Sequence, residues 1–148
     1  MTERKTRVIL FRGKSNSPNR DSEWVYGGFI PETKDTLPII VESCDNDDDT
    51  LYVDGWTTVD PETVGQYIGQ TDKNGTMVFE GDIVKIKDFT HGCALNFKQP
   101  TSNWVVHWSE KMARFCIDYM DIFPFDFTKS EVIGNIHDNP ELLGGNHG

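Results

Sequence analysis

The sequence has little of what marks a secreted, a membrane-spanning or a helical protein. It contains only three cysteines, Cys44, Cys93 and Cys116, in no C-x-x-C arrangement, so neither a disulfide framework nor a thiolate zinc site is indicated. The apolar stretch near its start, Val8 to Phe11, is too short for a signal peptide or a membrane span. We therefore expect reduced cysteines and a protein that stays in the cytoplasm.

Basic residues are missing from the middle of the chain. The formal net charge is -10, and residues 41 to 62 contain eight carboxylates and no Lys or Arg. Residues 1 to 20 have the opposite balance, with six Lys or Arg against Glu3 alone. Because phosphate neutralisation needs concentrated positive charge, this composition argues against general nucleic-acid binding, although a local basic strand could still touch phosphate.

Signals for strands dominate over signals for helices. Short runs rich in Val, Ile, Phe, Tyr and Trp recur between clusters of Gly, Pro, Asn and Asp, which is typical of antiparallel strands. Two hairpins are predicted in the first 56 residues. One joins residues 6–11 to residues 23–29, and the other joins residues 37–42 to residues 50–56 through the acidic run at 45–49.

The second half of the chain predicts one helical turn and several more strands. Asp60 before Pro61 signals the start of a short helix, and Asn74-Gly75 suits a tight turn. Strands are expected at residues 65–70, 76–79, 83–88, 103–109, 113–118 and 131–136, with irregular stretches at 89–101 and around 123–125. The fold class is mainly β, with a β-rich α+β fold as the alternative, and the hairpins are expected to form a small barrel-like fold. We expect one domain over 1–148, with a hairpin subdomain at 1–58 and a barrel-like part at 59–143.

One candidate for chemistry is the carboxylate pair at the start of a predicted strand. Glu80 and Asp82 flank Gly81 and could in principle do acid and base work or hold a cation. The structural interpretation is that Asp82 accepts hydrogen bonds from nearby backbone amides. With His91 and His107, the pair would form a cryptic site if the fold brought all four together.

The acidic run resembles a calcium-binding loop only at its start. Asp45, Asp47 and Asp49 alternate as calcium ligands do, but Thr50 and Trp56 stand where such a loop needs a glycine and a bidentate glutamate. A solvated acidic turn is therefore the preferred interpretation.

The spacing of the histidines and cysteines gives only weak support for a zinc site or for a reactive thiol. No second pair of ligands accompanies His91 and Cys93, and we expect no metal or other cofactor. A nucleophilic pair of Cys93 or Cys116 with His107 stays open, and buried sulfur is the simpler interpretation.

Alternating aromatic residues have two interpretations. Trp104, Val106 and Trp108 would form a stacking platform for bases if exposed, and the same pattern describes a core face, which we prefer. Trp24 and Tyr26 are similar, with a better chance of lying at an oligomer interface.

A longer pattern spans the centre of the chain. Residues 59–69 read VDPETVGQYIG, residues 72–75 read DKNG and residues 79–84 read FEGDIV. Residues 11–14, 23–27, 132–136 and 139–143 agree with the same pattern, so the sequence resembles the YopX family of phage and prophage proteins. The resemblance implies a protein encoded by a bacteriophage or prophage that works in the bacterial cytoplasm. It transfers no catalytic residues.

The first functional hypothesis is a non-enzymatic accessory protein. It would self-associate into a homo-oligomer or bind a host or phage protein, with nucleic acid disfavoured and no membrane partner. The candidate binding residues are Glu80, Asp82, His91, His107, Trp24 and Tyr26. Two alternatives stay open: a cryptic nucleotide-processing enzyme built on the first four residues, and an acidic mimic of nucleic acid that blocks a host DNA-binding protein.

Overall fold

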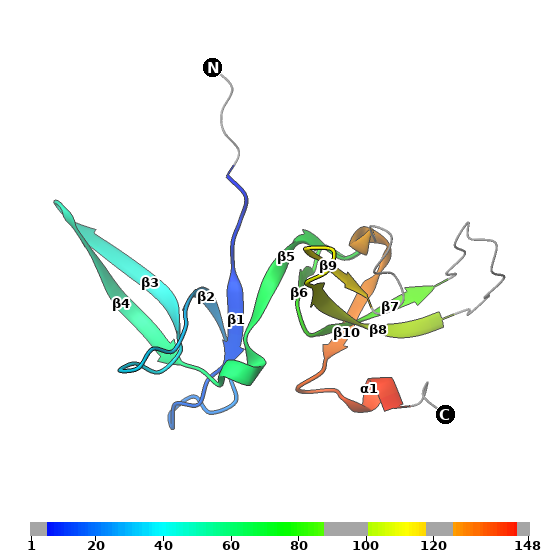
Figure 1. Cartoon of the computed structure of the whole chain (residues 1–148), viewed down its shortest axis with the longest axis horizontal. Coiled ribbons are helices and arrows are strands. Elements are labelled where there is room, and N and C mark those ends of the chain that lie inside the picture. The colour runs from blue at the N-terminus through cyan, green and yellow to red at the C-terminus, as the bar shows by residue number, and fades with distance from the viewer. Residues whose placement is uncertain (1–5, 88–100, 118–125, 145–148) are drawn as a thin grey trace, which may run out of the picture. The chain divides into compact units, whose positions relative to one another are not determined.

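The computed structural model describes residues 6–87, 101–117 and 126–144, and these form a mainly β protein (Figure 1). The described part contains ten strands, two 3-10 turns and one short helix. The strand pairs with a defined register are antiparallel. The predicted fold class is confirmed. The chain divides into two compact units, Met1–Gly69 and Gln70–Gly148, each described by itself below.

The first unit is one antiparallel sheet. Its strands follow the hydrogen-bonded order β4-β3-β2-β1-β5. Their bounds are β1 (Phe11–Lys14), β2 (Trp24–Ile30), β3 (Ile39–Asp47), β4 (Thr50–Thr58) and β5 (Gly65–Thr71). The end of β5 belongs to the second unit, where β6 (Met77–Phe79) follows it in the hydrogen-bonded order.

One face of this sheet holds the core of the first unit. Val25, Ile40 and Val59 are almost completely buried, and Phe11 and Phe29 pack against them. The two phenylalanine rings lie 5.7 Å apart between centroids and add an aromatic contact to the burial of apolar area. The core therefore comes from side chains that alternate along the strands with residues of the opposite face.

The strands β3 and β4 continue past the rest of the sheet as a two-stranded ribbon (Figure 1). The strand β2 pairs with β3 only over residues 39–41, whereas β4 follows β3 to the turn at Asp48, whose φ is 37°. The acidic run predicted as a loop is therefore mostly strand. Residues 42–56 are called the arm from here on.

The first strand lies further along the chain than predicted. It covers Phe11–Lys14 instead of residues 6–11, because β2 supplies partners only for residues 11–14. Residues 6–10 lie outside the strands, although the carbonyl oxygen of Leu10 accepts a hydrogen bond from the backbone N–H of Tyr67 at 2.7 Å. Val8 and Ile9 in this segment are 57% and 58% exposed.

The described strands form open sheets and no closed barrel. In the first unit, the end of β4 meets the end of β1 at a single bridge between Ser15 and Val59. One neighbouring hydrogen bond, from the N–H of Asn16 to the carbonyl oxygen of Thr58, measures 3.2 Å. A barrel needs a continuous ladder around its circumference, and this contact closes only the base of the sheet.

The second unit contains a four-stranded sheet in the order β10-β7-β8-β9. Its strands are β7 (Asp82–Lys87), β8 (Thr101–Ser109), β9 (Arg114–Ile117) and β10 (Glu131–Asn135). Val106 and Ile117 are fully buried, as the aromatic and apolar alternation predicts. The interpretation of Trp108 as a core residue is wrong: it is 44% exposed, because it lies near the end of β8, beyond the buried Val106, and Phe115 packs edge-on against it.

The helical elements are short. The 3-10 turn η1 (Pro61–Thr63) is capped by Asp60, whose side chain accepts the N–H of Glu62 at 3.1 Å, so the predicted helical turn is confirmed. The others are η2 (Phe127–Lys129) and α1 (Glu141–Gly144). No helix in the described residues is long and apolar enough to cross a membrane. Most of the irregular stretch predicted at 89–101, and all of that around 123–125, lies outside the described residues.

Candidate functional site

An apolar strip lies on the face of the first unit's sheet opposite the core. Tyr26 and Ile30 point to this face from β2, on either side of Gly28. Val41 lies opposite Gly28, and Trp56 lies opposite Val41 on the next strand. These residues therefore form one continuous row over three strands, called the outer strip from here on.

The outer strip is accessible to solvent. Tyr26 is 47% exposed, Ile30 is 44% exposed and Trp56 is 57% exposed. The space above Gly28 is open, since a Cβ built there would meet no atom within 4 Å. Contiguous exposed apolar surface is uncommon on monomeric proteins, and aromatic residues are enriched at interfaces, so the strip has the character of a binding surface.

The two aromatic residues predicted as interface candidates share this face but differ in surroundings. Trp24 lies opposite Lys14, and Tyr26 lies opposite Arg12. The guanidinium of Arg12 sits 4.5 Å from the centroid of the Trp24 ring, and the ammonium of Lys14 sits 5.5 Å from it. Cation–π attraction therefore engages the half-buried Trp24 within the chain and helps to explain how Arg12 is only 7% exposed.

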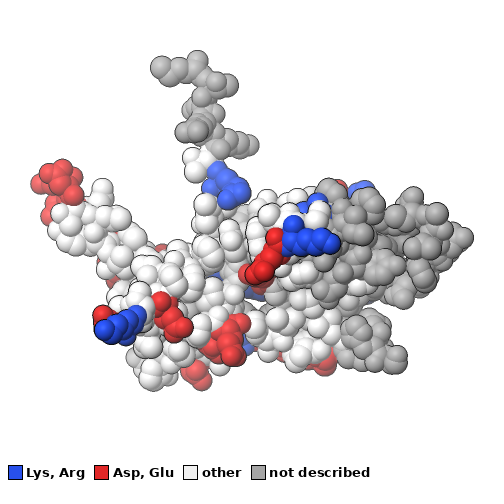
Figure 2. All heavy atoms as spheres, viewed as in Figure 1, with Lys and Arg blue, Asp and Glu red and all other residues white. Residues whose placement is uncertain are grey.

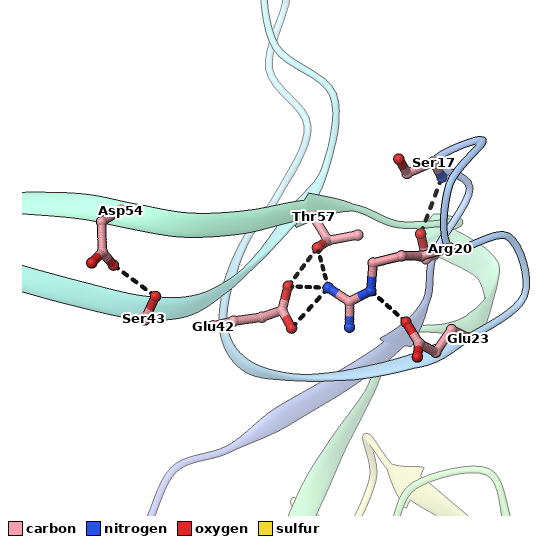
Figure 3. Close-up of polar contacts among 8 residues, drawn as sticks. Ser17, Arg20, Glu23, Glu42, Ser43, Asp54 and Thr57 are labelled. Carbon is pink, nitrogen blue, oxygen red and sulfur yellow. Dashed lines mark hydrogen bonds and ion pairs between the residues drawn. The ribbon is translucent and has the colours of Figure 1, made fainter.

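An ion-pair network holds the base of the arm (Figure 3). Arg20, from the turn between β1 and β2, donates to the two carboxylate oxygens of Glu42 at 2.8 and 3.1 Å and also pairs with Glu23. Thr57 bonds to Glu42 and accepts from Arg20. The hydrogen bond from Arg20, followed by that from Thr57, lowers the pKa of Glu42, and Glu42 in turn raises the pKa of Arg20.

The arm beyond this base exposes apolar side chains and a charged tip. Leu51 is 71% exposed, Tyr52 is 49% exposed and Val53 is 44% exposed. Figure 2 shows red carboxylates gathered at the tip, with mostly uncharged surface along the length of the ribbon. The acidic residues nearest the tip are Asp45, Asp47, Asp48 and Asp49.

In the second unit, one member of the predicted carboxylate pair Glu80 and Asp82 has a structural role, and that member is Asp82. Asp82 is 2% exposed, and its Oδ2 accepts the backbone N–H of Phe79 at 2.8 Å. Gly81 between them has a φ of 89°, which favours glycine, and Glu80 is half-buried on the same turn. The geometry therefore agrees with the structural interpretation of Asp82.

The structure brings one predicted thiol and imidazole together. Cys116 on β9 lies opposite His107 on β8, with Sγ 3.5 Å from Nε2. Cys116 is 1% exposed, so its thiol is closed to a substrate in this conformation. The other two cysteine and histidine candidates, Cys93 and His91, lie outside the described residues. Within the described part of the chain, no three His, Cys, Asp or Glu side chains are grouped as metal ligands.

A structurally important carboxylate that the sequence analysis missed is Asp72. It is 4% exposed and accepts backbone N–H groups from Asn74 at 2.8 Å, Thr76 at 2.9 Å and Val132 at 2.9 Å. Burial raises the pKa of Asp72, but the three donors outweigh it and the pKa lies below its ordinary value. The DKNG motif thus connects its own turn to β10 through the carboxylate of Asp72.

The two open antiparallel sheets, the exposed arm and the outer strip define a small β protein of two compact units. The family model described as YopX protein matches residues 11–144, and the chain belongs to the YopX family. Among solved structures, it is similar to the crystal structure of protein EF1440 from Enterococcus faecalis. The two are 23% identical with a TM-score of 0.61, over 93% of this chain and 99% of that chain, which shows a shared fold. No curated protein matches the chain.

Proposed function

We propose that this chain is a non-enzymatic binding module that self-associates or binds a host or phage protein, and that it serves as an accessory protein of a phage or prophage in the bacterial cytoplasm. The observation that carries the proposal is the exposure of Tyr26, Ile30 and Trp56 in one row on the outer strip. Covering that row removes apolar area from water, which favours association by about 25 cal/mol per Å².

The chemistry of the described residues favours binding over catalysis. The thiol of Cys116, the best placed nucleophile, is buried beside His107. Asp82 is committed to the backbone of Phe79. The outer strip, in contrast, offers rigid aromatic groups on a sheet, the type of residue that dominates binding energy at interfaces.

Light scattering coupled to size-exclusion chromatography tests the proposal. The full chain should elute as an oligomer whose mass falls on dilution. Replacing both aromatics, Tyr26→Ser with Trp56→Ser, should weaken association by about tenfold or more, since each buried aromatic anchor is worth more than about 1 kcal/mol. Leu37→Ser is the matched control, because Leu37 is 65% exposed and lies before β3.

A monomer at every concentration would remove self-association. Capture from infected cells would then compare the native chain with the Tyr26→Ser, Trp56→Ser variant. If both retain the same proteins, or neither retains any, the outer strip is no binding surface and the proposal fails.

The exposed charges at the arm tip favour a second function, an acidic mimic of nucleic acid that binds a host DNA-binding protein. Asp45, Asp47, Asp48 and Asp49 lie at the end of a ribbon that extends past β2, where Figure 2 shows red carboxylates. Alanine at Asp45, Asp47, Asp48 and Asp49 should abolish capture of such a host protein. Capture that survives these substitutions would contradict this function.

A further inference from the structure

The outer edge of the arm is an open strand edge. The strand β4 is the last in its sheet, and its base is bridged to Ser15 through Val59. Between residues 50 and 56, no backbone hydrogen bond to any segment other than β3 is found within the described part of the chain. Such an edge presents a row of donors and acceptors that another strand can pair with.

The side chains of this edge favour one kind of strand. Leu51, Tyr52 and Val53 supply apolar and aromatic surface that alternates between the two faces of the ribbon. Residues 42–56 also contain six carboxylates and no Lys or Arg. A strand that is both apolar and basic would therefore complement the edge, and a second acidic arm would be repelled.

The chain itself carries a segment with this chemistry. Residues 6–10, which precede β1, contain Arg7, Val8, Ile9 and Leu10, and Val8 and Ile9 are more than half exposed. Arg4 and Lys5 come just before them in the sequence. Val and Ile are strong strand formers, and yet this segment is outside the described strands.

We propose that the segment at residues 6–9 of one copy adds as a strand to the outer edge of β4 in the arm of a second copy. The pairing places one of Val8 and Ile9 beside Leu51 and Val53 and the other beside Tyr52 on the opposite face of the ribbon, and it sets Arg7 against the acidic arm. It rests on the self-association part of the proposed function and names two elements that meet in addition to the outer strip.

This mode of contact is directional. The donor segment and the acceptor edge are different surfaces, so each copy can give one and receive one. Two copies that exchange segments form a closed pair, and copies that pass the segment onward form a ring. Either assembly covers the β4 edge of each copy and leaves no acidic arm facing another.

Light scattering on the full chain provides the first test. The variant Val8→Asp with Ile9→Asp places charge in an exposed segment outside the described strands and should reduce association at least tenfold. The control Leu37→Asp adds the same charge at a residue that is 65% exposed and belongs to neither element, and it should leave association unchanged. Circular dichroism checks that each variant keeps its strands.

Disulfide capture provides the second test. In a Cys44→Ser background, one chain carries Val8→Cys or Ile9→Cys and a second chain carries Leu51→Cys or Val53→Cys. Neighbouring residues on paired strands lie close enough for a disulfide, so mild oxidation of the mixture should yield a covalent heterodimer. Two chains of distinct length make that product identifiable on a non-reducing gel.

The outcomes separate this inference from the function on which it rests. Association that survives the Val8→Asp, Ile9→Asp change, or disulfides that form only between two arm cysteines, would overturn the strand addition and leave self-association intact. A single chain with Ile9→Cys and Val53→Cys that closes on itself as a monomer would also overturn it. A native chain that never associates would overturn both the strand addition and the proposed self-association.

Discussion

At the scale of single residues, carboxylates stabilise turns by accepting hydrogen bonds from backbone N–H groups. Asp72 gathers three backbone N–H donors, two from its own turn and one from Val132 on β10. Bonds to an ionised acceptor are stronger than bonds between neutral groups, and a buried donor left without its partner is costly. The charge on Asp72 therefore supports the second unit as long as it is ionised.

Replacing Asp72 with Asn should destabilise the protein by about 2 to 3 kcal/mol at pH 7, because an amide offers one oxygen to three donors. The folded-state pKa of Asp72 lies below its ordinary value of 3.8, so its contribution is present above that pH and is lost as the pH falls through the lower folded value. Urea unfolding at pH 7 and near pH 3 should show that the deficit of the variant shrinks in acid.

Asp126 offers a matched control for this prediction. It accepts the backbone N–H of Thr128 at 3.1 Å and caps η2, but it is exposed. Asp126→Asn should cost less than Asp72→Asn, because water replaces the lost bonds. An equal or larger loss at Asp126 would contradict the importance assigned to burial.

At the scale of elements, the arm depends on a fastening at its base. A two-stranded ribbon is marginally stable by itself, and β2 supports β3 only up to Val41. Arg20 crosses from the β1–β2 turn to Glu42, while Ser43 Oγ donates to Asp54 at 2.6 Å (Figure 3). These contacts favour one orientation of the ribbon over many.

Arg20→Gln should loosen the arm while leaving the rest of the first unit folded. Amide exchange in residues 43–55 should become faster, and exchange at the core residues Val25 and Ile40 should not change, since the ion pair lies at the surface. Lys73→Gln is the control, because it removes a surface pair with Glu131 in the other unit. Unchanged exchange in the arm would mean that the ladder alone holds it.

At the scale of the whole molecule, the two units have separate cores. Ile40 is fully buried in the first unit and Ile117 in the second. Each core is supplied by its own sheet, as is usual for compact units that fold around their own apolar residues.

Ile40→Ala and Ile117→Ala should each cost about 2 to 5 kcal/mol, the usual price of a cavity in a packed core. Because the residues belong to different cores, the two losses should add in the double variant to within about 0.5 kcal/mol. Chemical denaturation of the four chains measures this. A larger departure from additivity would show that the two cores respond as one.

Local sequence signals predicted which strands and turns exist better than they predicted where each one begins and ends. Asp60-Pro61 correctly marked η1, and the alternation of apolar residues correctly placed Val106 and Ile117 inside. The acidic run at 45–49 correctly marked a turn but not its length, since the turn is confined to Asp48 and Asp49 while residues 45–47 pair with residues 50–52 along the ribbon. Pairing with a partner strand overrode the local preference.

The candidate site was less predictable than the fold. Tyr26 was identified from its aromatic neighbour, but Trp56 was missed, because its place in the outer strip depends on β3 lying between β2 and β4. The apolar run at Leu51 to Val53, set among carboxylates, was the available signal for the arm. An apolar run of this kind indicates a binding edge only when the structure shows that its strand has no partner on one side.

Composition, period-two alternation and turn residues were enough to predict a mainly β chain with uneven charge, because these properties depend on neighbours in the sequence. The resemblance to the YopX family came from the longer motifs at 59–84, and the family model confirms it. Only the folded chain shows the order of the strands and the exposure of the outer strip. It also shows that β3 and β4 extend past β2 as the arm. These features depend on which strands pair across long separations, and that pairing is settled by the combined packing of both faces of each sheet.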